Sequence, residues 1–329
     1  MRHTLKKLWA FRPLRRLHSR ERGVALVLLA LMLPVLAGMV SLVLDVGQLY
    51  EARRQVQTAT DAAALAGAAY LPESPSAAVA AAIDYAARNH VTIDPSDVEV
   101  YETHAANDTI RVTGVRNVGF GFARVLGMSQ HDVNASAKVM VGSAGGGIGI
   151  MPWALFPPDT YDYPDEVILH LAPQSNHGGN FGPLAIDGTG GNVYRTTIVH
   201  GSQQKLKKGD WVDTETGNMS GPTRQGLNQL IGSDSTTFDQ AVESNGDGTM
   251  RILAPNCPRL VIVPIIQELP KGGRINVQIV GFAQVFITDF GGNGNDCWVK
   301  ARFVRTIDPD ALWSPLDDDY GLRALKLVE

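Results

Sequence analysis

The sequence predicts an α+β protein in which an N-terminal transmembrane helix continues into a long Ala-rich stalk helix. A small α+β unit and a mainly β C-terminal domain follow. Three observations predict this order. Residues 24–44 form an uncharged apolar run, 14 of the 29 residues from Ala59 to Ala87 are alanine, and short β-type runs between turn signals fill residues 150–329.

Length and composition set the outer limits of the prediction. The chain has 329 residues, which suggests about two domains besides a membrane segment. Hydrophobic residues make up 44% and charged residues 19%, enough apolar material for packed cores, and this composition excludes a globally disordered chain.

Charge is distributed unevenly along the chain. Residues 1–23 hold eight basic residues and one acid, a net charge of +7, which leaves 21 basic and 32 acidic residues, a net −11, for the remainder. A basic tail can bind nucleic acid, but this one directly precedes an apolar run, which favours a role in orienting that run in a membrane. The acidic remainder gives no support for a nucleic-acid partner.

The apolar run predicts a transmembrane helix over residues 24–44. Its 21 residues, at 1.5 Å per residue, span the ~30 Å hydrocarbon thickness of a bilayer. Pro34 and Gly38 are tolerated in such a helix. The positive-inside rule leaves the tail, residues 1–23, in the cytoplasm and sends residue 45 onward across the membrane. The alternative is a cleaved signal peptide, whose apolar core would be only ~7–15 residues, with cleavage in the Ala-rich stretch from Ala62 to Ala69.

A long helix is predicted to continue from the membrane to about Tyr70. Apolar residues at spacings of seven, three and four define one face, and nothing breaks the pattern before Pro72. The residues of this face are Leu49, Val56, Ala59, Ala63 and Ala66. A second helix is predicted after Pro75, with Ser76 as its candidate N-cap, ending near Asn89. Such a stalk packs either against neighbouring subunits or only on its own domain.

The region around residues 20–70 resembles the N-terminal part of TadG-like proteins of the Tad (Flp, type IVb-like) pilus assembly system. The matching features begin with Arg22-Gly23, Pro34, Asp45-Val46-Gly47 and Leu49-Tyr50. They continue with Arg53, Arg54 and the run from Asp61 to Ala68. The resemblance implies a single-pass protein of the cytoplasmic (inner) membrane that helps to build or present pili.

The same resemblance implies partners and packing residues. The partners would be the lipid bilayer and other Tad/Flp components, namely TadE/TadF-like proteins or pilin subunits. Residues 45–69 would pack the stalk, and the candidates named for that role are Asp45, Tyr50, Arg53, Asp61, Ala63 and Ala66. One departure matters: type IV-like prepilins carry Glu at the fifth position after the cleaved Gly, where this chain has Leu28. This absence favours an uncleaved accessory component over a shaft subunit.

Residues 45–141 are predicted to form the stalk and a small α+β, pilin-like unit. Strands are expected at 97–103, 109–118 and 133–141, with a short helix at 121–127. Five glycines among the eight residues 142–149 predict a flexible linker and a domain boundary.

Residues 150–329 are predicted to form a mainly β barrel or sandwich on the far side of the membrane. The one helix expected there is Gly221–Ile231, and Ile275–Phe286 is long enough for a central strand. The expected strands are Val167–Leu171, Phe181–Ile186, Gln204–Leu206, Trp211–Val212, Leu260–Ile266, Ile275–Ile287 and Cys297–Val304. Segments 180–201, 209–227 and 259–269 resemble the C-terminal domain of some TadG-related proteins.

Cys257 and Cys297 are the only cysteines, and in an oxidising compartment such a pair favours a disulfide. A metal site or a catalytic thiol is the alternative, although neither has partner residues recognisable in the sequence. The loops 245–249 and 291–297 are rich in oxygen-bearing side chains and could hold calcium, but neither matches the 12-residue calcium loop.

No enzymatic motif is recognisable, because Walker A, HExxH and GxSxG sequences are all missing. We therefore expect a non-enzymatic component of pilus assembly without a cofactor. The alternatives are a surface-exposed binding or adhesion module held by one helix, and an envelope hydrolase.

Overall fold

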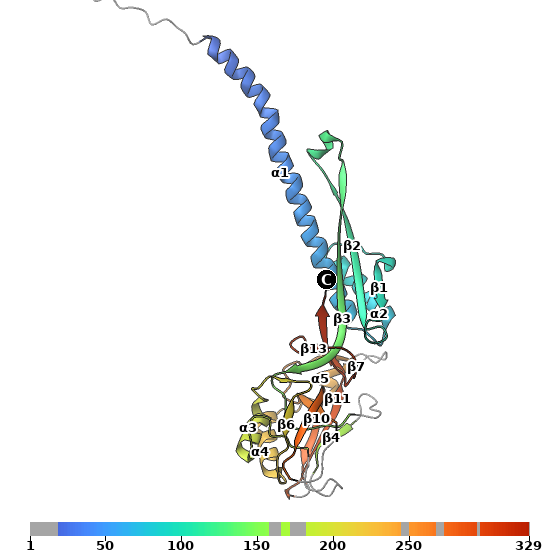
Figure 1. Cartoon of the computed structure of the whole chain (residues 1–329), viewed down its shortest axis with the longest axis vertical. Helices are drawn as coiled ribbons and strands as arrows, with labels where there is room; N and C mark the ends of the chain where they lie inside the picture. Colours follow the sequence, from blue (N-terminus) through green and yellow to red (C-terminus); the bar gives the residue numbers. More distant parts are fainter. Residues whose placement is uncertain are drawn as a thin grey trace, which may run out of the picture. The chain divides into compact units, whose positions relative to one another are not determined.

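A computed structural model describes most of the chain, and two compact units can be distinguished in it. The described residues are 19–157, 166–171, 182–244, 250–267, 273–294 and 297–328. Unit 1 comprises Met1–Arg54 and Arg116–Val133, and unit 2 comprises Gln55–Val115 and Asn134–Glu329. The predicted basic tail falls mostly on residues 1–18, which lie outside the described residues. The α+β class is confirmed, with one long apolar helix followed by a mainly β region (Figure 1).

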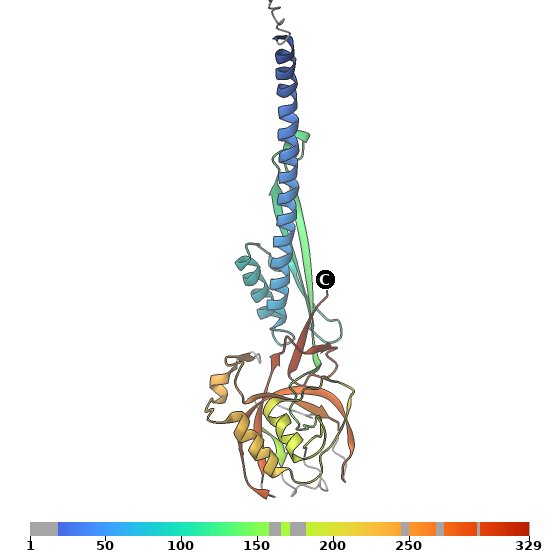
Figure 2. The same cartoon turned by 90° about the vertical axis from the view of Figure 1, so that its left-hand side faces the viewer.

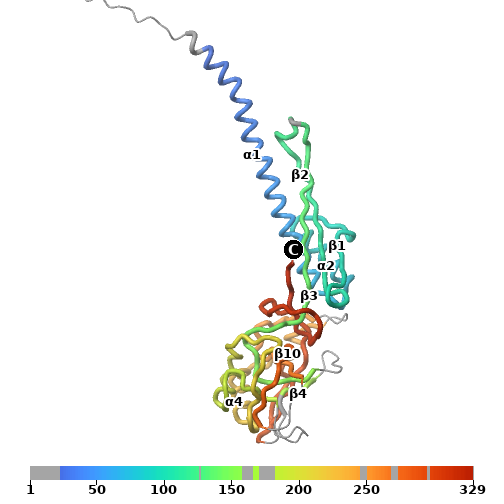
Figure 3. Tube along the Cα trace, viewed as in Figure 1, coloured from blue at the N-terminus to red at the C-terminus, as the bar shows by residue number. Residues whose placement is uncertain are grey.

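Unit 1 contains most of α1 and the end of a β-hairpin. The helix α1 runs without interruption from Ser19 to Ala68 and includes Pro34, as expected for a membrane helix that continues into a stalk. The hairpin is formed by β2 (Thr109–Gly119) and β3 (Gln130–Gly147), joined through the short helix η2 (Ala123–Leu126). Figure 3 shows this connection as a tight loop at the end of the two strands. A small apolar cluster packs α1 against the two strands of the hairpin. It consists of Leu49 and Ala52 from α1, Val118 from β2 and Val133 from β3.

Unit 2 contains a seven-stranded sheet with the order β1-β2-β3-β14-β12, and β13 and β5 also pair with β3. Its parallel pair is β12 with β14, whereas β14, β13 and β5 run antiparallel to β3. The remaining strands are β1 (Val98–Tyr101), β5 (Leu206–Lys207), β12 (Thr306–Ile307), β13 (Leu312–Ser314) and β14 (Leu322–Leu327).

The end of α1 and the helix α2 (Pro75–Arg88) form an alanine-rich core with this sheet. Small side chains allow the helices to approach closely. A Cβ on Gly67 would lie 2.8 Å from the carbonyl oxygen of Ala78. The predicted second helix is thus present, but its N-cap is Ser74 rather than Ser76, and no side chain caps it. The buried alanines are Ala59, Ala63, Ala64, Ala68, Ala78, Ala82 and Ala86.

The glycine-rich run 142–149 is not the predicted linker, and this prediction is wrong. Residues 142–147 form the end of β3 and are largely buried. Glycine is required there for close strand contact, because a Cβ on Gly142 would overlap the Ser314 carbonyl oxygen and the Trp313 ring. The predicted boundary between residues 141 and 150 therefore falls inside a sheet. The C-terminal strand β14 pairs with β3 in that same sheet, on both sides of residue 142.

A second, five-stranded sheet has the order β4-β11-β10-β6, with β9 also paired to β10. The long strand β10 is central, as predicted from Ile275–Phe286, and lies antiparallel to β6, β9 and β11. Five of the strands predicted from apolar runs in residues 150–329 are present in this sheet. Their bounds are Glu166–Leu171 for β4, Trp211–Asp213 for β6, Leu260–Ile266 for β9, Asn276–Gly291 for β10 and Trp298–Val304 for β11.

Two helices pack into the core of this second sheet. The helix α4 (Ser220–Ile231) was predicted, whereas α3 (Gly191–His200) was not. Their side chains Tyr194, Ile198 and Leu227 join the buried strand residues in one cluster. Figure 2 shows α3 and α4 as neighbouring yellow-green and gold helices. No strand forms over the described part of the predicted segment 181–186, where Leu184 makes an isolated bridge to Thr214.

The remaining elements are short. They are η1 (Pro95–Asp97), α5 (Phe238–Ala241), β7 (Val242–Ser244) and β8 (Met250–Ile252). The strands β7 and β8 pair antiparallel as a separate two-stranded sheet.

Candidate functional site

The apolar segment of α1 is the first functional feature. Among the described residues, one helix is long and apolar enough to cross a membrane, and almost none of its apolar segment is covered by the rest of the chain. Leu26, Leu33 and Val43 are 70%, 56% and 70% exposed. A continuous apolar surface of this size is incompatible with exposure to water, which is consistent with single-pass membrane anchoring.

Asp45, the first charged residue after the apolar segment, binds the backbone of the hairpin loop. Its Oδ1 accepts a hydrogen bond from the Gly121 amide at 2.7 Å, and its Oδ2 accepts bonds from the Phe122 and Ala123 amides, both at 2.9 Å. Asp45 as a whole is 4% exposed. Within its own chain Asp45 thus satisfies three backbone amides, and the prediction that it packs the stalk against partners stays a prediction.

Phe122 provides a second contact between the loop and α1. A Cβ on Gly38 would lie only 2.7 Å from the Phe122 ring, so the ring occupies the space that a side chain at residue 38 would fill. Gly38 is buried, in contrast to the apolar residues around it. The glycine in the apolar segment therefore has a packing role that the sequence pattern did not reveal.

Replacing Asp45 is expected to loosen the hairpin loop from α1. In Asp45→Ala the amides of residues 121–123 lose their acceptor, so their hydrogen exchange should accelerate in the detergent-solubilised chain. Asp45→Asn retains one carbonyl acceptor and should give a smaller increase. The matched control is Glu51→Ala, an exposed acid farther along α1. Unchanged exchange at residues 121–123 in Asp45→Ala would contradict this assignment.

The other predicted stalk residues divide between exposed and buried positions. Tyr50 is 73% exposed and Arg53 is also exposed, so both are available to a partner. Ala63 is fully buried in the core of its own unit, whereas Asp61 and Ala66 are half-buried. The Asp61 carboxylate accepts a hydrogen bond from Gln57 Nε2 at 2.7 Å. Packing of the exposed residues against other proteins stays a prediction.

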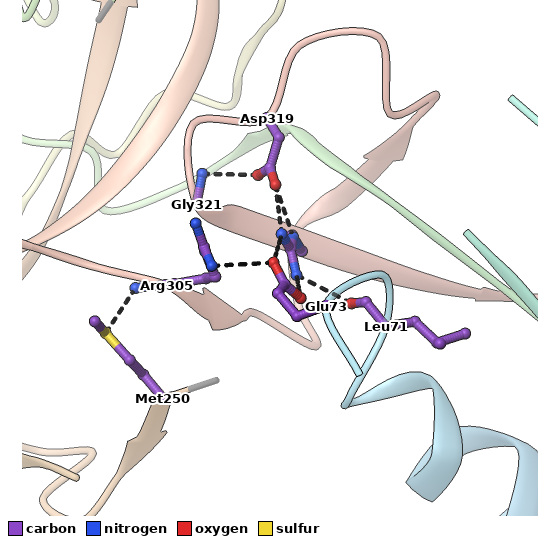
Figure 4. Close-up of polar contacts among 7 residues, drawn as sticks. Leu71, Glu73, Met250, Arg305, Asp319 and Gly321 are labelled. Atoms are coloured by element: carbon purple, nitrogen blue, oxygen red, sulfur yellow. Dashed lines mark hydrogen bonds and ion pairs between the residues drawn. The ribbon is translucent and has the colours of Figure 1, made fainter. Parts of the chain in front are cut away.

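A buried cluster of charges in unit 2 was missed by the sequence analysis (Figure 4). Arg323 on β14 is 4% exposed and donates to the Leu71 carbonyl at 3.0 Å, to both Glu73 carboxylate oxygens at 2.5 and 2.7 Å, and to Asp319. Arg305 lies 3.1 Å from Glu73. The positive charges of the two arginines thus balance the negative charges of Glu73 and Asp319. The cluster connects the turn between α1 and α2 to the C-terminal strand β14.

The cluster makes stability depend on pH. Burial disfavours the charge of Asp319, but the Arg323 charge and hydrogen bonds from Arg323 and the Gly321 amide hold the pKa of Asp319 below its usual value. Likewise, Asp108 is buried, but hydrogen bonds from the amides of His104, Ala105 and Thr103 and from the Thr109 hydroxyl lower its pKa. A group with a lowered folded-state pKa stabilises the protein above its unfolded pKa, and the stabilisation is lost as pH falls through the folded pKa.

We therefore expect the urea midpoint to stay level down to about pH 4, near the unfolded aspartate pKa, and to fall at lower pH. Asp319→Asn should flatten this acid dependence because it removes one titrating group. An Asp319→Asn variant with the full acid dependence of the parent would remove Asp319 from the explanation.

A pocket of about 480 Å³ lies beside the charge cluster. Its wall is partly apolar and partly charged, a combination that suits a small amphipathic ligand. Within the part of the chain that the structure describes, no group donates a hydrogen bond to the buried Oε1 of Gln284, another lining residue. The principal lining residues are Glu73, Met250, Ile252, Pro255, Gln284, Arg305, Ile307, Pro309 and Arg323.

The two cysteines do not form the predicted disulfide in this structure. Both are buried free thiols in different surroundings. Cys257 belongs to a cluster with Phe238 and Phe286, whereas Cys297 Sγ lies 3.9 Å from the Ser220 carbonyl oxygen. Burial raises the pKa of Cys297, which favours the thiol over the reactive thiolate. The prediction failed because sequence separation does not report where two side chains are buried.

The candidate calcium loops lie largely outside the described part of the chain. Residues 245–249 lie entirely outside it, and residues 295–296 interrupt the second loop. Among the residues that are described, no group of three or more His, Cys, Asp or Glu side chains is arranged to hold a metal ion.

Comparison with known proteins adds one finding. Residues 23–69 match a family model described as "Putative Flp pilus-assembly TadE/G-like". The matched segment covers most of α1, including the apolar residues and Asp45. No curated protein and no solved structure matches the chain. The resemblance noted for the C-terminal segments stays a prediction.

Proposed function

We propose that this chain, which carries the Flp pilus-assembly TadE/G-like region at residues 23–69, is a membrane-anchored accessory component of pilus assembly. It acts without catalysis. Its N-terminal tail lies in the cytoplasm, and the region after Asp45 lies outside the cytoplasmic membrane. The observation that carries the proposal is the exposed apolar surface of α1 inside the family-matched segment.

The proposed binding partners are inferred from the same family-matched segment, residues 23–69. Other Tad/Flp components, TadE/TadF-like proteins or pilin subunits, contact the stalk beyond the membrane. The exposed side chains of Tyr50 and Arg53 support this, because α1 leaves them uncovered while it buries Ala63 in its own core. Arg53 follows Tyr50 by three positions, so the two residues lie on one side of the helix.

Deleting the gene and counting surface pili tests the proposal. We expect few or no pili in the deletion strain and recovery with the parental gene, but not with Tyr50→Ala/Arg53→Ala. The matched control is Lys205→Ala, an exposed residue far from α1 in sequence. Normal piliation in the deletion strain would refute the assembly role. Protease digestion of spheroplasts, in which the outer face of the cytoplasmic membrane is accessible, tests the orientation, since a protected C-terminal region would place it in the cytosol.

The pocket in unit 2 supports a second candidate function, a surface-exposed binding or adhesion module. Its volume of about 480 Å³ falls within the range of small-molecule sites, ≈ 300–1,000 Å³. A screen of glycans and matrix proteins against the full chain should find a ligand that Ile252→Trp, which fills the pocket, no longer binds. Binding that is unchanged in Ile252→Trp would exclude this pocket as the site.

A further inference from the structure

We propose that the loop between β2 and β3, residues 120–128, is a second membrane-contacting element that enters the leaflet at the Asp45 end of the transmembrane segment. The inference rests on the proposed membrane anchoring of α1. Every residue that carries it belongs to unit 1, in which the loop and the apolar segment lie together.

The depth of the loop follows from its two contacts with α1. Asp45 marks the end of the apolar segment and binds the amides of Gly121, Phe122 and Ala123. The Phe122 ring occupies the space over Gly38, which lies six residues before Leu44. At 1.5 Å per residue, Gly38 is about 9 Å inside the apolar segment. If residues 24–44 fill the bilayer, the Phe122 ring is within its hydrocarbon layer.

The loop presents apolar side chains at the same level. Val125 is 79% exposed and Met128 is 55% exposed, although both are large hydrophobic residues. Both belong to the loop whose Phe122 ring packs at Gly38 on α1, so a bilayer around the helix would also reach them. Apart from Arg124, the side chains of residues 120–128 are apolar, and polar pairs such as Asn117 Nδ2 with Asp132, at 2.7 Å, lie on the strands that lead away from the loop.

The backbone of the loop is also suited to a medium without water. In lipid, each unsatisfied amide costs several kcal/mol. Asp45 accepts from three amides, and carbonyl oxygens within the loop accept from Val125, Gly127 and Met128 at 2.9, 3.1 and 3.0 Å. The Phe120 amide donates to the Ser129 carbonyl at 3.0 Å. Arg124 is exposed, and its long side chain can extend to the phosphate layer while its stem remains in apolar surroundings.

Lipid quenching of a probe on the loop tests the inference. The background is the full chain with Cys257→Ala, in an apolar cluster, and Cys297→Ser, which keeps a donor near Ser220. Single cysteines replace Val125 in the loop, Leu33 in the apolar segment and the exposed Lys205. Each carries an NBD fluorophore, and the chain is placed in phosphatidylcholine–phosphatidylglycerol vesicles with or without doxyl-labelled lipid. We expect the Val125 probe to lose fluorescence as the Leu33 probe does, and the Lys205 probe to be unaffected.

The outcomes separate this inference from the anchoring proposal. If Leu33 is quenched while Val125 behaves like Lys205, α1 is anchored and loop insertion is refuted. If Leu33 is not quenched either, both the anchor and the inference fail. A blue-shifted but unquenched Val125 probe would show that protein rather than lipid covers the loop, which would also refute insertion.

Discussion

Arg323→Ala is expected to lower the free energy of unfolding by about 3–5 kcal/mol, because it leaves buried carboxylates without their partner. Arg323 is almost fully buried and bonds to Glu73 and Asp319. Burial alone would disfavour its charge, but the Glu73 hydrogen bonds and the Asp319 charge raise its pKa, so the cation is retained. Urea unfolding of the full chain in detergent, followed by fluorescence, measures the change.

The matched control is Arg251→Ala, which breaks the Arg251–Glu243 pair at 2.6 Å. Those side chains are 68% and 46% exposed, so we expect a change of only about 0–1 kcal/mol. Both variants remove an arginine bound to glutamate, but Arg323 is buried and also bonds to Asp319 and the Leu71 carbonyl, so the comparison measures the buried network against an exposed pair. Equal effects of the two variants would show that the buried cluster does not join β14 to the turn after α1.

Replacing two leucines of the apolar segment by lysine is expected to abolish stable membrane integration. Leu33 and Leu36 are 56% and 55% exposed and lie near the middle of residues 24–44. Each Lys there costs about 2.5–3.5 kcal/mol for insertion, so Leu33→Lys/Leu36→Lys costs about 5–7 kcal/mol. Alkaline carbonate extraction of membranes should release this variant but retain the parent.

The control places the same charges beyond Asp45. Val46 and Tyr50 are also exposed residues of α1, at 58% and 73%, but they follow the apolar segment. Val46→Lys/Tyr50→Lys should remain in the membrane pellet. Retention of Leu33→Lys/Leu36→Lys in the pellet would mean that residues 24–44 are not the anchor.

Local patterns predicted the features that depend on neighbouring residues. The apolar run, the helix that follows it and α2 were predicted because helical spacing and alanine content act within a few turns. The strands β9, β10 and β11 were predicted for the same kind of reason, since each is a long apolar run between turn signals. The helix α3 was missed because its sequence, GNVYRTTIVH, contains five β-branched residues and no alanine.

The candidate site shows the limit of that local information. Asp45 stood out in the sequence as the first charge after the apolar segment, but its partners Gly121, Phe122 and Ala123 lie 76 to 78 residues away. Arg323 stands between the apolar residues Leu322 and Ala324 on a strand, where alternation places it on the opposite face, so the local pattern did not indicate that it is buried. No pattern could identify Glu73, 250 residues earlier, as its partner.

By itself, the sequence determined the apolar segment, its continuation into an Ala-rich helix, the family of that region and most of the strands. The tertiary structure alone decided that the glycine-rich run is a buried strand, that β14 returns to pair with β3, and that both cysteines are buried free thiols. The physical reason is range. Helix and strand propensities act between neighbours in the chain, whereas strand pairing, thiol burial and buried charge pairs are set by residues that only folding brings together.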